Sequence, residues 1–430
     1  MQNVQKLTLA VLIQAALIST AYASEQSEAK GFVEDAEGSV LFRTGYINRD
    51  KKAPGKKDQS SAAQSAIVKL ESGFTQGVVG FGVNAVGDAS FKLGENKNAN
   101  NGMIPKHADG SAYDHWARGG ASVKARVSNT TVEYGTQVLD IPVLASNTGR
   151  MVPEYFTGVL ATSHEIENLE VIAGKFTKNQ YSDQINTDSE KLDRAVVWGA
   201  KYKVNDALNT AYYGVDIKDK LERHYANVNY KQALANDSSF TYDFSGYHTE
   251  FEPGTTYSAT VADPSTQNTH NTIFAVSGTY NKDVHNLMLA YQQNSGNVGY
   301  DYSGNGDGYQ SIYMPNSYLS DFIGNDEKSV QLQYSYNFKN QGLAGLNWTT
   351  AYVYGWDIKA TDNKGTIISD HAKEREFFNQ VKYTVQSGFA KDASLRLRNS
   401  YYRASNDYQS NYIGDTNEWR IFLDIPVKLF

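Results

Sequence analysis

The end of this chain, NEWRIFLDIPVKLF, alternates apolar and polar side chains and finishes on an aromatic residue, Phe430. In an extended strand successive side chains point to opposite faces, so Leu423 and Ile425 share one face while Arg420 and Asp424 share the other. One face can therefore contact lipid while the other contacts water. Such a C-terminal strand is typical of antiparallel β-barrels that cross the outer membrane of Gram-negative bacteria.

The N-terminus indicates export. Lys6 precedes an apolar stretch at residues 7–18, and Ala21-Tyr22-Ala23 provides a small-residue cleavage site. This arrangement predicts a signal peptide at residues 1–23 and a mature single barrel domain at residues 24–430. The apolar stretch is too short to span a bilayer, and no later segment contains 18 consecutive apolar residues. Membrane insertion is therefore expected through strands.

The composition agrees with a barrel that has a wet interior. The chain has 30 Tyr and 35 Gly but only 8 Pro, and its mean hydropathy is −0.52. A polar average with many aromatic residues fits strands that face lipid on one side and water on the other. The formal charge of −7 excludes a general basic surface for nucleic acid. Cysteine is absent, which excludes disulfides and thiolate metal sites. On composition alone, a soluble secreted β-protein remains an alternative.

Two-faced segments recur along most of the chain. The clearest is at residues 330–338, and similar alternation is found at 123–127, 196–203 and 377–385. Tight turns are expected at Asn205-Asp206 and Lys391-Asp392. Long polar loops are expected at the following residues: 50–66, 94–116, 140–166, 252–271, 296–328 and 360–374. At roughly 20–25 residues per strand and connection, the exported chain holds about 16–18 strands, enough to enclose an aqueous channel.

Five stretches resemble the OprD family of substrate-specific outer-membrane porins, and the resemblance runs from Gly31 to Phe430. The stretches are LFRTGY (41–46), ARGGASVKARVSNTTVEYG (117–135), PVLASNTGRMVPEYFTG (142–158), NSYLSDFIGNDEKSVQLQYSYNF (316–338) and YTVQSGFAKDASLRLRNSYYR (383–403). The resemblance implies an all-β transmembrane barrel of eighteen strands, narrowed by inward-folded loops. It also implies passive uptake of small carboxylates and amino acids, with carbapenem-type antibiotics as possible cargo, past a ladder of basic residues facing an acidic pocket.

Alternation places several basic side chains on the water-filled side of this barrel. Arg396 and Arg398 lie two residues apart, with Leu395 and Leu397 on the opposite face. The complete predicted ladder is Arg43, Arg49, Lys124, Arg126, Arg396, Arg398 and Arg420. A guanidinium group offers two parallel donors to a carboxylate and keeps its charge, so a row of arginines suits the passage of an anion. The alternative is that these residues brace the wall by pairing with lumen acids such as Glu71 or Glu133.

Residues 140–158 are the candidate constriction. Pro142, Gly149 and Pro153 favour an ordered loop. Arg150 is its expected basic contribution, and Tyr318 and Asp321 of the second inward loop are expected opposite it, where they could meet a substrate ammonium. The alternative is an extracellular loop tip in solvent.

Other function classes have less support. An outer-membrane enzyme would need a catalytic constellation, and no G-x-S-x-G motif is present. An energised transporter would need a plug domain before the barrel, which the residues between Ser24 and Ser39 do not provide. A sugar or general porin remains an alternative, because the many tyrosines could form stacking faces. The eight histidines show no H-E-x-x-H spacing, so neither a metal nor a cofactor is expected. The expected partners are solutes, outer-membrane lipid and, through Phe430, the barrel-assembly machinery.

Overall fold

The structure, a computed structural model, describes residues 24–96, 98–186, 192–252, 269–302, 312–362 and 366–430. The predicted signal peptide at residues 1–23 therefore lies outside the described residues. The strands are β1 (Glu37–Lys51), β2 (Gln59–Glu71), β3 (Val79–Lys92), β4 (His115–Val127), β5 (Thr130–Gln137), β6 (Asp140–Ile141), β7 (Leu144–Ala145), β8 (Tyr155–Ile166), β9 (Leu169–Gln180), β10 (Ala195–Lys203), β11 (Leu208–Ile217), β12 (Leu221–Ala233), β13 (Ser238–Phe251), β14 (His270–Lys282), β15 (His285–Gly296), β16 (Lys328–Asn337), β17 (Leu346–Thr361), β18 (Ile367–Thr384), β19 (Ser394–Ala404) and β20 (Thr416–Lys428), with 3-10 helices at Phe338–Gln341 and Asn406–Tyr408.

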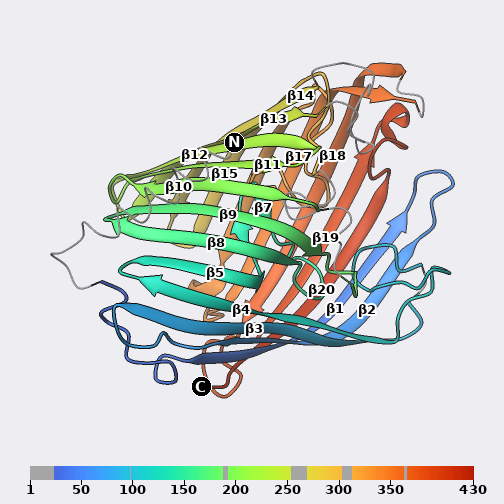
Figure 1. Cartoon of the computed structure of the whole chain (residues 1–430). Coiled ribbons are helices and arrows are strands. Elements are labelled where there is room, and N and C mark those ends of the chain that lie inside the picture. The colour runs from blue at the N-terminus through green and yellow to red at the C-terminus, as the bar shows by residue number, and fades with distance from the viewer. Residues whose placement is uncertain (1–23, 97, 187–191, 253–268, 303–311, 363–365) are drawn as a thin grey trace.

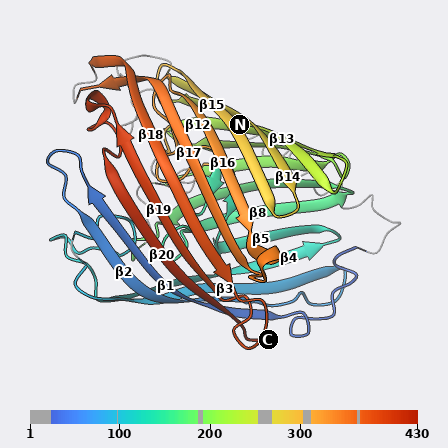
Figure 2. The same cartoon turned by 180° about the vertical axis from the view of Figure 1, so that it is seen from behind.

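Eighteen of these strands form one antiparallel sheet that closes on itself (Figures 1 and 2). Each strand of the sheet pairs with its neighbours in sequence, and β1 pairs with β20 to close the barrel, with Val40 opposite Val427. The short strands β6 and β7 pair only with each other, as a hairpin that is not part of the barrel sheet. The predicted eighteen-strand antiparallel barrel is thus confirmed.

The wall has the two faces that the alternation predicts. On β16, Val330 and Leu332 are exposed on the outside, whereas Gln331 between them is 1% exposed on the inside. On β20, Ile421 and Leu423 are likewise exposed and Phe422 is buried. The outside can therefore contact lipid, and the polar inside is kept for water and for loops. None of the helices in the described residues is long and apolar enough to cross a membrane.

The two rims of the barrel differ. At one rim the connections are short, and residues such as Ser128, Asn168 and Asp283 adopt positive φ angles of 54°, 63° and 51°, as tight hairpin turns require. The described N-terminal segment reaches this rim, where the backbone N–H of Gln26 donates to the Ser128 carbonyl. Short turns mark the periplasmic rim of an outer-membrane barrel, so the long loops lie on the extracellular side.

Some predicted connections were wrong. The loops expected at 50–66 and 360–374 are largely strand, because β2 begins at Gln59 and β18 begins at Ile367. These strands extend beyond the apolar belt, the band of exposed apolar side chains on the outside of the barrel. Beyond this band both faces of a strand contact water, so the alternation of apolar and polar residues that marks a strand disappears. Conversely, the tight turn expected at Lys391-Asp392 belongs to a longer connection over residues 385–393. The turn at Asn205-Asp206 is short, as predicted. Parts of two further long loops, 253–268 and 303–311, lie outside the described residues.

The apolar core lies inside the barrel, where two loops fold inward. Residues 138–154, the constricting loop, include β6 and β7 and bury Leu144 and Val143 completely against the β8–β14 wall. The second loop, residues 297–327, buries Phe322 and Ile323 in its described part. The alternative of a solvent-exposed tip for the constricting loop was therefore wrong.

Candidate functional site

The basic residues of β1, β19 and β20 form one continuous group in the lumen. Arg420 lies directly opposite Arg398 across the β19–β20 pair, and Arg49 lies opposite Glu418 across the closure. One step toward the periplasmic rim Arg396 is opposite Phe422, and one step further Arg43 is opposite Asp424. We call Arg43, Arg49, Arg396, Arg398 and Arg420 the basic ladder. Its order follows from register, since three adjacent strands place their inward side chains in consecutive layers.

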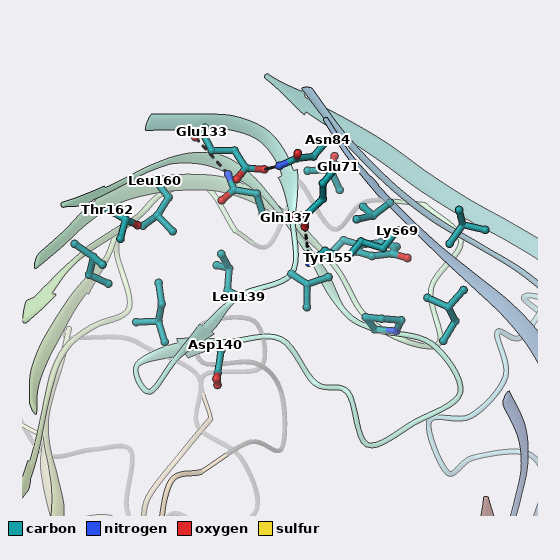
Figure 3. A pocket seen from close by; sticks show the side chains of 18 of the residues that line it. Lys69, Glu71, Asn84, Glu133, Gln137, Leu139, Asp140, Tyr155, Leu160 and Thr162 are labelled. Carbon is teal, nitrogen blue, oxygen red and sulfur yellow. Dashed lines mark hydrogen bonds and ion pairs between the residues drawn. The ribbon is translucent and has the colours of Figure 1, made fainter. Parts of the chain in front are cut away.

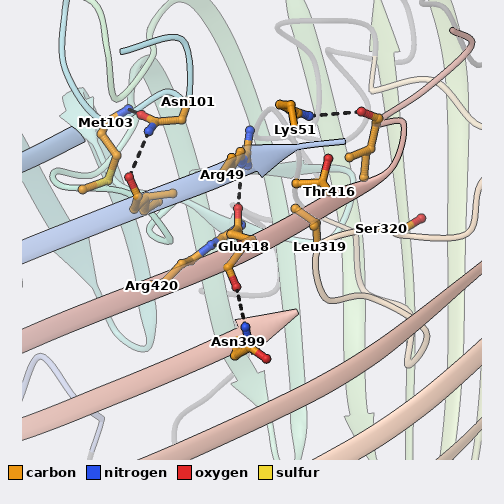
Figure 4. Close-up of polar contacts among 12 residues, drawn as sticks. Arg49, Lys51, Asn101, Met103, Leu319, Ser320, Asn399, Thr416, Glu418 and Arg420 are labelled. Carbon is orange, nitrogen blue, oxygen red and sulfur yellow. Dashed lines mark hydrogen bonds and ion pairs between the residues drawn. The ribbon is translucent and has the colours of Figure 1, made fainter. Parts of the chain in front are cut away.

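Glu418 links two arginines in the part of the ladder nearer the extracellular side (Figure 4). Its carboxylate accepts from Arg49 Nε at 2.7 Å and from Arg420 Nε at 2.5 Å. Glu418 is 1% exposed, so this buried charge is compensated by two guanidinium groups. The predicted bracing partners were wrong: Glu71 pairs with Lys69 at 2.5 Å, and Glu133 accepts from Asn84 and Ser122.

Arg43 joins the ladder to the constricting loop. Its Nε lies 2.7 Å from an oxygen of Asp424. Its Nη1 donates to the backbone carbonyls of Arg150 at 2.8 Å and Thr148 at 3.2 Å. One guanidinium group therefore neutralises a wall carboxylate and fixes the position of the loop that narrows the lumen.

Arg396 and Arg398 have a different environment. Among the residues that the structure describes, neither forms an ion pair with a carboxylate. The Arg396 guanidinium lies 5.2 Å from the ring centre of Phe422, and that of Arg398 lies 4.9 Å from the ring centre of Phe378. The Nε and Nη2 atoms of Arg398 are buried and have no hydrogen-bond partner. The aromatic rings fix these two cations without neutralising them.

The constricting loop is anchored by a buried ion pair that the sequence reasoning missed. Arg118 contacts Asp88 at 2.9 Å, and both side chains are fully buried. Arg118 Nη2 also donates to the Pro153 carbonyl at 2.6 Å. On the other side of the loop, the Tyr247 hydroxyl donates to the Pro142 carbonyl at 3.1 Å. Both ends of the loop are therefore tied to the wall.

The second loop presents Tyr318 and Asp321. The ring of Tyr318 stacks on Phe378 with centroids 4.1 Å apart, next to Arg398. Asp321 accepts hydrogen bonds from the hydroxyls of Tyr302 and Ser317, one at each carboxylate oxygen. Burial raises the pKa of Asp321 above its ordinary value, and the two hydroxyl donors oppose this effect.

The ladder and the two loops enclose a cavity of about 680 Å³. Six of the ten predicted site residues line it: Arg49, Arg150, Tyr318, Asp321, Arg398 and Arg420. Lys51, Lys56 and Lys57 add positive charge on the extracellular side. The cavity lining therefore combines basic groups with hydroxyl groups and one carboxyl group.

Lys124 and Arg126 do not join this group. Their charged groups lie 4.8 Å and 4.1 Å from the ring centre of Phe74. Arg126 also contacts Glu25 at 3.6 Å, which places the pair beside the N-terminal segment at the periplasmic rim. Alternation correctly predicted that they face inward but could not place them along the lumen.

A second cavity of about 540 Å³ lies against the other side of the constricting loop (Figure 3). Leu139 and Asp140 of the loop line it, together with Glu71, Glu133 and Lys69 from the wall. The first cavity contains Thr148 and Arg150 of the same loop. One loop thus separates a basic chamber from a chamber with more acidic than basic residues.

Comparisons with known proteins agree with this architecture. Residues 30–429 match the family described as outer membrane porin, OprD family. Porin D of Pseudomonas aeruginosa is 36% identical over 96% of this chain and 95% of its own length. The crystal structure of Acinetobacter baumannii OccAB1 is 70% identical, covers 95% of this chain and 100% of the solved chain, and has a TM-score of 0.91. The crystal structure of Pseudomonas aeruginosa OpdK with vanillate is 25% identical, covers 93% and 100% of the two chains, and has a TM-score of 0.81.

Proposed function

Because this chain belongs to the OprD family of outer-membrane porins, we propose that it is a passive channel selective for small solutes that carry a carboxylate, including amino acids. Its relatives are porins, which are transport channels and not enzymes. The family membership shows the outer-membrane location and the channel function. The selectivity for carboxylate-bearing solutes is our proposal.

The observation that carries this proposal is the pair of uncompensated cations in the basic ladder. Arg49 and Arg420 share Glu418, and Arg43 pairs with Asp424, so their charge is largely cancelled. Arg396 and Arg398 form no ion pair with a carboxylate in the described residues, and Arg398 lines the first cavity. A carboxylate that passes along this wall can accept from these guanidinium groups without breaking an existing ion pair.

The spacing of the ladder supports conduction instead of trapping. Arg398 and Arg396 are two residues apart on β19, which corresponds to about 6–7 Å along a strand. A small carboxylate can therefore contact the second guanidinium group before it leaves the first. Several moderate sites in series let a solute enter and leave, whereas one deep site would hold it.

The side of the cavity formed by the second loop suits the second charge of an amino acid. Asp321 and the Tyr318 hydroxyl line the same cavity as Arg398. We propose that an ammonium group is oriented by this side while the carboxylate follows the ladder. Vanillate, the ligand in the OpdK crystal structure, is also a carboxylate, which agrees with the proposed solute class. Carbapenem-type antibiotics carry a carboxylate as well and are further candidates.

The test is a pair of nearly identical solutes, benzoate and benzamide, which differ in charge but little in shape. We expect purified wild-type protein in phospholipid vesicles to pass benzoate faster than benzamide. The R396Q/R398Q variant should lose this preference by lowering benzoate flux, with benzamide flux unchanged. R375Q/R403Q is the matched control, because it removes two arginines of β18 and β19 that lie on the outer face of the barrel.

Two results would contradict the proposal. Equal passage of benzoate and benzamide by the wild type would indicate a general pore. An unchanged benzoate preference in folded R396Q/R398Q, shown by heat-modifiable mobility on a gel, would remove the ladder from the explanation.

A further inference from the structure

Two arginines face each other on the outer surface of the barrel, one on β18 and one on β19, and β19 also carries Arg396 and Arg398 of the basic ladder. Arg375 of β18 lies directly opposite Arg403 of β19 in the strand register. Arg375 is exposed and Arg403 is half-buried. Like charges directly opposite each other on one face of a sheet are destabilising. The pair is therefore unfavourable unless something neutralises it.

We call Arg375 and Arg403 the outer arginine pair. The pair lies at the extracellular edge of the apolar belt. The next outward residues toward the periplasmic rim are Phe377 and Tyr401, which are 45% and 41% exposed. Further exposed apolar residues follow on both strands in the same direction: Val381, Tyr383, Leu395 and Leu397. Aromatic residues mark the boundary between hydrocarbon and headgroups. The arginines therefore lie at headgroup depth on the extracellular side.

The protein itself does not neutralise this pair. In the described part of the chain, neither arginine forms an ion pair with a carboxylate. Arg403 donates to neutral acceptors, namely the carbonyls of Tyr402 at 2.7 Å and Thr416 at 3.3 Å, and to Asn417 Oδ1 at 2.8 Å. Lys373, the next outward residue of β18 toward the extracellular end, is exposed and adds a third cation.

The acidic residues nearby are occupied elsewhere. Asp415 accepts from the backbone N–H of Ala404 and from Gln409 at 2.7 Å. Asp357 pairs with Lys328 at 2.9 Å. Asp50 pairs with Lys52 at 2.7 Å. The local excess of positive charge is thus a property of the folded wall.

We propose that the outer arginine pair, with Lys373, binds the phosphate groups of the phosphorylated glycolipid in the outer leaflet of the outer membrane. Guanidinium groups present paired donors that match phosphate oxygens, and they stand where the headgroups of that leaflet lie. The acyl chains of the same lipid would cover the exposed side chains of Phe377, Tyr401 and Leu397. Lipid binding would cancel the repulsion within the pair and fix β18 to β19 at the membrane boundary.

The test uses bisphosphorylated lipid A as the probe, with binding to the purified, lipid-stripped protein measured by native mass spectrometry. We expect the wild type to bind this lipid. The R375Q/R403Q variant should bind it with an affinity lower by about tenfold or more, because two charge-assisted contacts are lost. K282Q/K391Q is the matched control, because it removes two exposed lysines at the periplasmic rim. Its lipid binding should equal that of the wild type.

Three further readouts decide between explanations. Lipid A without phosphates should bind the wild type as weakly as the double variant binds the intact lipid. Millimolar inorganic phosphate should not displace the lipid, and displacement would show a free-anion site instead. Equal binding of intact lipid A by R375Q/R403Q and by the wild type would overturn the proposal. Unchanged benzoate flux through R375Q/R403Q shows that this variant is folded.

Discussion

Arg420 of β20 lies directly opposite Arg398 of β19, and both guanidinium groups line the same cavity. Glu418, two residues before Arg420 on the same face, compensates Arg420 and Arg49. Of these three neighbouring guanidinium groups, Arg49 and Arg420 share one carboxylate, and Arg398 does not pair with it. The ladder combines a neutralised part, which braces the barrel closure, with a part whose charge is available to a solute.

Replacing Glu418 by Gln separates these two roles. The substitution leaves Arg49 and Arg420 without a carboxylate, which we expect to lower stability by at most about 3–5 kcal/mol, since lumen water screens part of the exposed charge. The temperature of the heat-modifiable gel shift should fall. The reversal potential in asymmetric salt should move toward stronger anion selectivity, because the lumen loses one negative charge.

Glu327→Gln is the control for Glu418→Gln, since both change a buried glutamate to its neutral isostere. Burial raises the pKa of Glu327 well above its ordinary value, so its protonated form is favoured. The amide then replaces a group whose charged form burial already disfavours, so the heat stability and the ion selectivity should change less than in Glu418→Gln. Equal losses in both variants would show that a general packing defect, and not the charge of Glu418, explains the result.

Alternation fixed which face of a strand each side chain occupies, but not its depth along the lumen. The same rule that predicted an inward Arg420 also predicts an inward Glu418, because the two residues are two positions apart on the same strand. Glu418 could therefore have been identified from the sequence as a partner of the ladder. Lys124 and Arg126 obey the rule, yet they lie on β4 at the periplasmic rim. The bond from Arg43 to the Arg150 carbonyl joins residues 107 apart in sequence. No local pattern encodes such a contact, because it depends on how an irregular loop packs inside a closed wall.

Arg43 variants test the tether of the constricting loop. Arg43→Met removes the hydrogen bonds to the carbonyls of Thr148 and Arg150, so the loop should move more. Arg43→Lys keeps the positive charge but cannot contact Asp424 and both carbonyls at once. We expect larger open-channel noise in single-channel recordings for both variants, and reduced anion selectivity only for Arg43→Met. Recordings of Arg43→Met that match the wild type in noise and conductance would show that the other anchors of the loop suffice.

Asp321 predicts a pH dependence for solutes that carry an ammonium group. Burial raises its pKa above the ordinary range, so its charge is lost as the pH falls through this raised value. Affinity for arginine, measured as block of the single-channel current, should therefore weaken from neutral to mildly acidic pH. In Asp321→Asn the affinity should be weak and independent of pH over that range. A raised pKa also means that this group stabilises the fold at low pH and that the contribution is lost as the pH rises.

Phe430 tests assembly separately from stability. Its carbonyl accepts from Gly38 N–H at 3.5 Å, and its ring lies over Gly38, where a Cβ would come within 2.7 Å of it. The side chain is nevertheless 59% exposed, so we expect it to contribute little to the finished barrel and to act during assembly instead. Deleting Phe430 should lower the amount of protein in the outer membrane, whereas protein refolded in detergent should keep its heat stability. Leu429→Ala, which trims a neighbouring exposed apolar side chain at the same rim, should be inserted normally. Normal outer-membrane levels after deletion of Phe430 would rule out the proposed role of the terminal aromatic residue.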